Sequence, residues 1–128
     1  MEQTLALWHQ SVANKTTEHF DQLFAEDCVF YSPVVHSPQE GRELTKLYLS
    51  GAVAVLGGDF RYIKEVVSGN HAILEFISIV DDLQVNGVDI ITFDEQGRIC
   101  EFKVMIRPLK AINLLHGKMQ EMLQQLSA

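Results

Sequence analysis

Val88-Asp89-Ile90-Ile91-Thr92-Phe93 runs directly into Asp94-Glu95-Gln96-Gly97-Arg98-Ile99. The first stretch is rich in β-branched and aromatic residues, which predicts a mostly buried strand. The second stretch begins as a turn with a glycine late in it, and an alternating strand follows, so the two strands form a hairpin. Asp89 is out of place there, because a carboxylate buried without a partner costs several kcal/mol. The acid must therefore be paired, protonated or open to a cavity.

Two interpretations of Asp89 stay open at this point. In one, the carboxyl group is structural and is tied to a backbone amide, an arginine or Trp8. In the other, Asp89 lines an enclosed pocket and is the functional acid of the protein. The residue types alone do not separate the two.

Apolar periodicity outlines the remaining elements. It predicts a helix over about 3–14, and a second helix that Thr16 or Thr17 caps, with Phe20, Leu23 and Phe24 on its apolar face. A short strand over 27–32 ends at Pro33. Helix and strand patterns then follow one another along the rest of the chain. They give a helix over about 42–56, strands over 60–67, 71–80, 83–93 and 98–107, and a last helix over about 109–126. Asn86-Gly87 marks a bend, a bulge or the close approach of a ligand.

This order predicts an α+β fold with a single domain over 1–128. Short turns link the four later strands, so the sheet is largely antiparallel and buries one face against the helices. In the last strand Cys100, Phe102, Val104 and Ile106 share the face that should point inward. If the sheet curls around the helices, this inner face lines a cone.

Composition excludes several classes of protein. The 128 residues carry a net charge of −7 and ten scattered basic residues, so neither nucleic acid nor an anionic membrane is an expected partner. No stretch approaches the ~20 apolar residues of a membrane span. The first ten residues lack the features of an export signal, so we expect a cytoplasmic protein whose cysteines, Cys28 and Cys100, are not paired.

Patterns typical of metal or cofactor sites are also missing from the sequence. The five histidines show neither His-x-His nor His-Glu-x-x-His spacing, and Gly57-Gly58 is a break after a helix instead of a phosphate loop. We therefore expect no metal and no cofactor.

The layout resembles the nuclear transport factor 2-like superfamily, and within it the SnoaL-like and ketosteroid-isomerase-like bacterial proteins. The resemblance rests on three segments in order, Asp27–Pro33, Gly41-Arg42-Glu43 and Gly87–Ile99, and it covers roughly residues 5–110. It implies a cone-shaped barrel, in which a curved, mostly antiparallel sheet wraps around N-terminal helices and a C-terminal helix follows. It also implies a deep apolar pocket, a homodimer, and activities such as double-bond isomerisation, cyclisation or dehydration.

Carried over residue by residue, the resemblance is partial. Asp89 occupies the place of the aspartate that donates a hydrogen bond to the enolate oxygen in ketosteroid isomerases, which are a known case of a carboxyl group kept neutral by an apolar site. Trp8 occupies the place of the tyrosine that is the second donor, and its indole N–H donates but cannot transfer a proton. Ser32 occupies the place of the aspartate that acts as general base.

A serine without an activating partner is no base at neutral pH, so the isomerase mechanism does not carry over as it stands. His36, three residues beyond Pro33, is the best substitute because an imidazole titrates near neutral pH. His9 and Tyr31 are weaker candidates.

Three functions remain open. The first is an enzyme that acts on a small apolar carbonyl compound through an enol-like state, with Asp89 stabilising the oxygen and His36 or a water moving the proton. The second is a non-catalytic module that binds a small apolar molecule, and the third is a dimeric scaffold whose pocket is closed by its own side chains. The expected ligand contacts are Trp8, Phe30, Ser32, Phe102, Val104 and Ile106.

Overall fold

The structure is a computed structural model that describes residues 1–127, with side chains through residue 125. It is an α+β fold in which helices precede and follow one sheet. The elements are α1 (Glu2–Ala13), α2 (Phe20–Leu23), β1 (Phe24–Tyr31), β2 (Gln39–Glu40), α3 (Arg42–Leu56), β3 (Arg61–Ser68), β4 (His71–Val80), β5 (Leu83–Phe93), β6 (Ile99–Arg107) and α4 (Leu109–Ser127).

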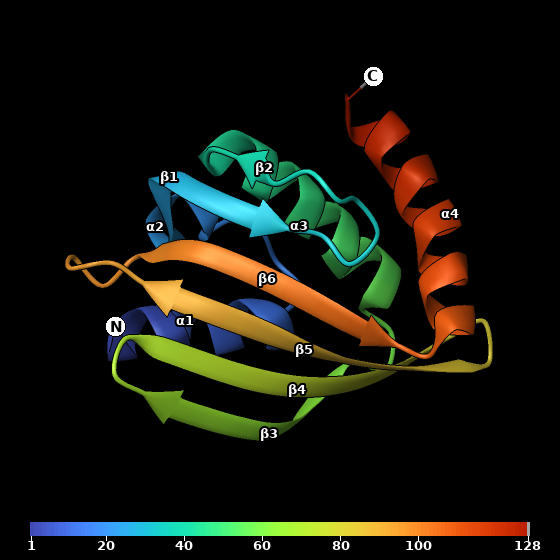
Figure 1. Ribbon diagram of the computed structural model, residues 1–128, viewed down its shortest axis with the longest axis horizontal. Helices are drawn as coiled ribbons and strands as arrows, with labels where there is room; N and C mark the ends of the chain where they lie inside the picture. The colour runs from blue at the N-terminus through green and yellow to red at the C-terminus, as the bar shows by residue number, and fades with distance from the viewer. Residues whose placement is uncertain (128) are drawn as a thin grey trace.

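The six strands form one curved sheet in the order β2-β1-β6-β5-β4-β3. Five consecutive pairs make up this sheet, and all are antiparallel except β1 with β6, so the expected mostly antiparallel sheet is confirmed. In Figure 1 the helices α1 and α3 lie behind the sheet, and α4 leaves the end of β6 and stands beside α3. The result is a cone whose inner face is covered by helices.

The alternation of β5 decides which side chains enter the cone. Val85, Ile91 and Phe93 are at most 1% exposed. The residues that point to the opposite face are half-buried: Asn86, Val88, Ile90 and Thr92. Asp89 shares their face, because successive side chains of a strand point to opposite sides of the sheet. The predicted buried strand with one acid inside it is therefore what the chain forms.

Gly87 lies in regular pairing with Phe76 on β4 and Ile106 on β6, so neither a bend nor a bulge occurs there. A Cβ atom at this position would lie 2.4 Å from the Phe76 ring and 2.8 Å from the Met105 carbonyl oxygen. Glycine is needed because the Phe76 side chain crosses over β5 at this point. The close approach is made by the protein's own aromatic ring.

Two local predictions are wrong. The second helix is a single turn, and Phe24 begins β1 instead of continuing that helix, three residues earlier than the strand predicted over 27–32. Phe24 is fully buried and pairs with Ile99 of β6, so contacts made far along the chain override its local preference. The loop expected before α3 also contains a short strand, β2, which pairs with Val29 and Phe30.

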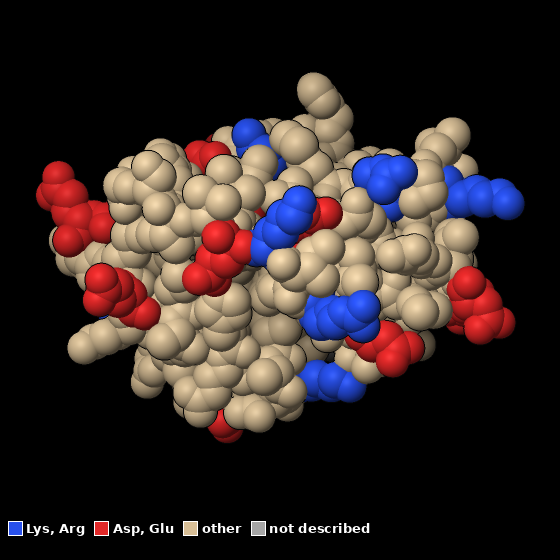
Figure 2. All heavy atoms as spheres, turned by 90° about the horizontal axis from the view of Figure 1, so that it is seen from below, with Lys and Arg blue, Asp and Glu red and all other residues tan. Residues whose placement is uncertain are grey.

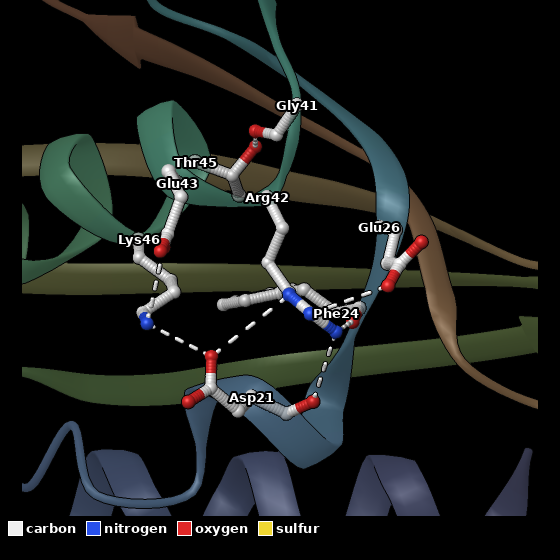
Figure 3. Close-up of polar contacts among 8 residues, drawn as sticks. All are labelled: Asp21, Phe24, Glu26, Gly41, Arg42, Glu43, Thr45 and Lys46. Carbon is white, nitrogen blue, oxygen red and sulfur yellow. Dashed lines mark hydrogen bonds and ion pairs between the residues drawn. The ribbon is translucent and has the colours of Figure 1, made fainter.

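A group of charged side chains ties α2 to the start of α3 (Figure 3). Lys46 Nζ lies 2.8 Å from Asp21 Oδ1, and this bond is the main reason that the pKa of Asp21 is lowered. The Arg42 guanidinium donates to the carbonyl oxygens of Asp21 and Phe24 at 3.5 and 3.4 Å. Asp21 is largely exposed, so its ion pairs are worth little individually. We interpret the group as an anchor for α3.

Within residues 1–127, no helix is both long and apolar enough to cross a membrane. The same residues contain no group of three or more His, Cys, Asp or Glu side chains arranged to hold a metal ion.

Candidate functional site

The inner face of the sheet, α1 and α3 enclose a cavity of about 60 Å³. Its walls are almost entirely apolar, and its polar groups come from Trp8, Tyr62, Asp89 and Lys15. The apolar walls are formed by Val12, Leu49, Ala52, Val53, Leu56, Phe60, Phe76, Phe102 and Val104. An apolar cavity with a few polar groups is the usual form of a small-molecule site.

Asp89 lies on β5, in the middle of the sheet, with β4 on one side and β6 on the other. Its backbone neighbours across the strands are Leu74 and Val104, and Asp89 itself is 5% exposed. The carboxyl group therefore has apolar side chains on either side of it. Burial of this kind disfavours the charged form of an acid.

Three side chains form one chain of hydrogen bonds at this end of the cavity. The indole Nε1–H of Trp8 donates to the hydroxyl oxygen of Tyr62 at 3.0 Å, and the Tyr62 hydroxyl donates to Asp89 Oδ2. An indole N–H can only donate, so Trp8 donates to the Tyr62 oxygen and leaves the Tyr62 hydroxyl hydrogen free to bind Asp89. Helix α1, strand β3 and strand β5 are thereby linked through their side chains.

Aromatic packing holds the Trp8 indole in place. Its ring lies 5.0 Å from the Phe102 ring, edge-on, and 6.2 and 6.3 Å from the rings of Phe20 and Phe24. Aromatic pairs prefer such tilted and offset arrangements, and each adds stability beyond its buried area. Trp8 is 3% exposed, so its N–H is oriented by surroundings that leave it little freedom.

Burial raises the pKa of Asp89 to about 7, against a lowering contribution from the Tyr62 hydrogen bond. The pKa of Tyr62 is raised as well, mainly by burial and then by the neighbouring Asp89 charge. Tyr62 thus keeps its proton, and near neutral pH a large part of the Asp89 population is the neutral acid.

With Oδ2 accepting from Tyr62, a neutral Asp89 carries its proton on Oδ1. Oδ2 accepts from Tyr62, and Oδ1 has no hydrogen-bond partner within the described residues. Among those same residues, no fully enclosed side-chain oxygen or nitrogen is left unpaired, so Oδ1 must have access to open space. Because Asp89 lines the cavity, a neutral Asp89 presents an O–H donor to whatever occupies it.

A second apolar cavity of about 40 Å³ is lined by residues of α3, α4 and the sheet. Ala52, Leu56 and Val104 line both cavities and separate them. Of the ligand contacts expected from the sequence, Trp8, Phe102 and Val104 share the first cavity with Asp89. Phe30, Ser32, Ile106 and again Val104 line the second.

Neither Ser32, at the place of the base, nor the substitutes considered for it, His36, His9 and Tyr31, line the cavity of Asp89. Ser32 Oγ accepts hydrogen bonds from the backbone N–H groups of Val34 and Val35 at 3.1 and 3.3 Å, so it shapes the turn after β1. His36 is exposed in the loop between β1 and β2 and lines neither cavity. The cavity that contains Asp89 and the apolar walls is therefore formed without Ser32 and His36.

Tyr62 is the member of the site that sequence reasoning missed. A signal was present, since Phe60 and Tyr62 alternate at the start of β3 and thus share the inward face. The rest of β3 is exposed, and its pairing with β4 shifts between Tyr62 and Lys64. A phenol that enters an apolar face needs a polar partner, which points to a buried acid.

The fold and the site now define the class of protein. A curved sheet around N-terminal helices, with an acid on the inner face beside an apolar cavity, is the nuclear transport factor 2-like fold. Residues 5–102 match the model of the SnoaL-like domain, and the chain belongs to that family.

Solved structures agree with this assignment. The chain is similar to a steroid delta-isomerase from Pseudomonas aeruginosa, with 33% identity, a TM-score of 0.93, and coverage of 99% of this chain and 94% of the other. It is also similar to an uncharacterised protein with a cystatin-like fold from Silicibacter pomeroyi, with 32% identity, a TM-score of 0.88, and coverage of 94% and 85%.

A protein of unknown function from Mesorhizobium loti, called NTF2-like, shares the fold at 20% identity, with a TM-score of 0.74 and coverage of 84% and 90%. Among curated proteins no match to the chain was found.

The raised pKa of Asp89 makes stability depend on pH. The folded state holds this proton more tightly than an unfolded chain with a pKa of 3.8, so the contribution is full below about pH 4 and is lost as the pH rises to about 7. We expect Asp89→Asn to remove this loss, making the variant more stable than the wild type at pH 8 by roughly 2–4 kcal/mol relative to their difference at pH 4. Urea unfolding followed by circular dichroism at both pH values measures it.

Asp59→Asn, in an exposed loop, is the matched control and should show no such change. A stability difference between wild type and Asp89→Asn that is the same at pH 4 and pH 8 would mean that Asp89 keeps an ordinary pKa. Loss of folding in Asp89→Asn would assign the carboxyl a structural role.

Proposed function

We propose that the protein binds a small, largely apolar carbonyl compound and polarises its carbonyl group through Asp89. The observation that carries the proposal is the free Oδ1 of Asp89, an acid of raised pKa that opens onto an apolar cavity. A neutral acid donates one strong hydrogen bond, and a carbonyl oxygen accepts it. The apolar walls select the remainder of the ligand by size and shape.

The hydrogen-bond chain supports this role over a purely structural one. Tyr62 satisfies Oδ2 alone, and Asp89 lines the cavity together with the packed rings of Trp8 and Phe102. A scaffold whose pocket is filled by its own side chains would leave no such cavity. The similarity to a steroid delta-isomerase is consistent with a carbonyl ligand, since steroid enones carry one.

Catalysis of proton transfer is the second candidate. A donor at the carbonyl oxygen stabilises the enol-like state that isomerisation, cyclisation and dehydration share. A base must also reach the carbon next to the carbonyl, and His36, the residue expected to move the proton, does not line the cavity of Asp89. Binding and polarisation of the carbonyl group are therefore better supported than turnover.

A titration with 2-heptanone tests the proposal. Trp8 is the only tryptophan, so its indole N–H gives a single signal in a ¹H–¹⁵N spectrum, and it lies in the hydrogen-bond chain to Asp89. We expect saturable shifts of this signal and an affinity that falls as the pH rises through about 7, because the ionised acid no longer donates. Asp89→Asn should weaken binding roughly three- to thirtyfold by replacing an acid donor with a weaker amide donor.

Heptane of the same chain length is the matched control ligand. Equal binding of heptane and 2-heptanone, or unchanged affinity in Asp89→Asn, would contradict a carbonyl held by Asp89. In D₂O the same samples report turnover, since enolisation replaces the protons next to the carbonyl with deuterium. Exchange faster than in buffer, and lost in Asp89→Asn, would support the catalytic candidate.

We further propose that the protein is a homodimer that pairs through the outer face of the sheet. Val66, Ile73 and Met105 project from this face and are 59%, 41% and 52% exposed. Lys64, Glu75 and Arg107 border them with charges of both signs, so a second copy related by a twofold axis can match the pattern. Figure 2, which shows the molecule from below, shows acidic and basic side chains interspersed among uncharged surface, some of them side by side.

Light scattering after size exclusion tests the dimer. We expect twice the mass of the chain for the wild type, and the mass of one chain for Met105→Glu, because a charge buried in an apolar interface costs several kcal/mol. Leu44→Glu places the same charge on another exposed apolar residue, on α3, and should leave the mass unchanged. A wild type with the mass of one chain would refute the proposal.

A further inference from the structure

Lys15 stands at the rim of the Asp89 cavity with no partner for its charge. It follows α1 and its cap Asn14, and its backbone takes the left-handed conformation, with a φ of 52°. Its side chain is exposed, lines the cavity, and makes neither an ion pair nor a side-chain hydrogen bond within the described residues. A lysine commonly covers an apolar surface with its methylene groups while its ammonium group stays in water.

The position of the lysine side chain is defined by α3. Its Cδ atom lies 3.6 Å from the point where a Cβ atom of Gly57 would be, and Gly57 is the residue at which α3 ends. The end of α1 and the end of α3 thus meet at the mouth of the cavity, and Lys15 lies between them. The cavity therefore has the hydrogen-bonded group of Trp8, Tyr62 and Asp89 inside it and the Lys15 side chain on its rim.

We infer that the ligand of this cavity carries a carboxylate as well as a carbonyl group: an apolar oxo acid whose carbonyl meets Asp89 and whose carboxylate meets Lys15. The inference rests on the proposed function, because it takes the carbonyl position from Asp89. Lys15 is the one cation that lines the cavity. A single ammonium group matches a singly charged carboxylate, whereas phosphate groups are commonly held by several donors or by the fork of an arginine.

The apolar walls of the cavity set the form of the rest of the ligand. Val12, Val53 and Phe60 offer no partner to a polar group in the middle of the molecule, so its centre is hydrocarbon. Because Asp89 and Lys15 sit on separate elements, the preference for an acid must peak at one chain length. The distance between the two groups of the ligand is what the site selects.

Lys15 has one competing role, which a test must separate. The last carbonyl groups of α1 and α3 carry partial negative charge, and a lysine near them stabilises the helix ends. In that role Lys15 would change the stability of the fold without affecting the choice between ligands. The readout is therefore a ratio of affinities, which a purely structural role would leave unchanged.

The experiment compares methyl ketones with methyl-ketone acids of equal carbon number: 2-pentanone with 4-oxopentanoate, 2-heptanone with 6-oxoheptanoate, and 2-nonanone with 8-oxononanoate. The Trp8 indole signal of the full chain reports binding of each probe at low salt. We expect the acid to bind roughly three- to tenfold more tightly than its ketone at one chain length, and the preference to shrink in 0.5 M NaCl, since a rim ion pair is screened.

Lys15→Met keeps the side-chain length and removes the charge, and the affinity ratio of acid to ketone should fall to about one. Lys15→Glu should reverse the preference, since it places like charges together. Lys110→Met, which removes a cation from the exposed start of α4, should leave every affinity as in the wild type.

The inference is overturned if no acid is preferred at any length, or if Lys15→Met keeps the wild-type ratio. Binding of the ketones that depends on Asp89, without a preference for acids, would leave the proposed function standing and remove only the role of Lys15. If no ketone or acid shifts the Trp8 signal, the proposed function fails and the inference fails with it.

Discussion

The hydrogen bond from Tyr62 to Asp89 is the interaction around which this molecule is arranged. An acid in the middle of a sheet, between Leu74 and Val104, must give up its hydration, and the cost of doing so is large for a charge and modest for a neutral group. A single phenol satisfies one oxygen and leaves the other free. The outcome is a carboxyl group whose pKa is raised to about 7 and which lines an apolar cavity.

The fold positions each part of this arrangement by a different device. Strand alternation on β5 turns Asp89 inward, and the start of β3 brings Tyr62 over it from the edge of the sheet. Helix α1 adds Trp8, which is oriented by the rings of Phe20, Phe24 and Phe102. Stability and the proposed function oppose each other at this point, because the acid expected to destabilise the fold above neutral pH is the group proposed to meet the ligand.

Within the SnoaL-like family the chain shows how one pocket can separate binding from catalysis. The donor side of the pocket is complete, whereas Ser32 is engaged in its own turn and His36 lies outside. Ala52, Leu56 and Val104 line two cavities, of which one is also lined by Asp89 and the other by Ser32. The proposed role of the Asp89 cavity is therefore to hold and polarise a carbonyl group, and neither Ser32 nor His36 lines that cavity as an acceptor for a proton.

Much of the fold could be predicted from residue patterns. The helix over 42–56 and the strands over 71–80 and 83–93 have the predicted bounds, because period-3.6 and period-2 patterns are strong where one face is buried. The start of β1 could not be predicted, since Phe24 takes its conformation from Ile99, far away in the chain. The same holds for Gly87, whose reason is the Phe76 ring on another strand.

The site was predictable to a smaller extent. Asp89 stands out in sequence as an acid in an apolar strand, and Trp8 follows from the resemblance to a known pocket. Tyr62 and Lys15 do not stand out, because a tyrosine near a strand edge and a lysine after a helix are ordinary in sequence. Their roles arise only when β3 and the ends of α1 and α3 converge on the same cavity.

Direct titration of the Asp89 carboxyl carbon by ¹³C NMR, with Asp89→Asn used to assign its signal, tests the central claim. We expect the titration of Asp89 to have its midpoint near a pKa of about 7, well above the ordinary 3.8. A midpoint at or below 3.8 would mean that Asp89 is a carboxylate throughout the neutral range. The cavity would then present an acceptor instead of a donor, and a carbonyl ligand would have nothing to bind.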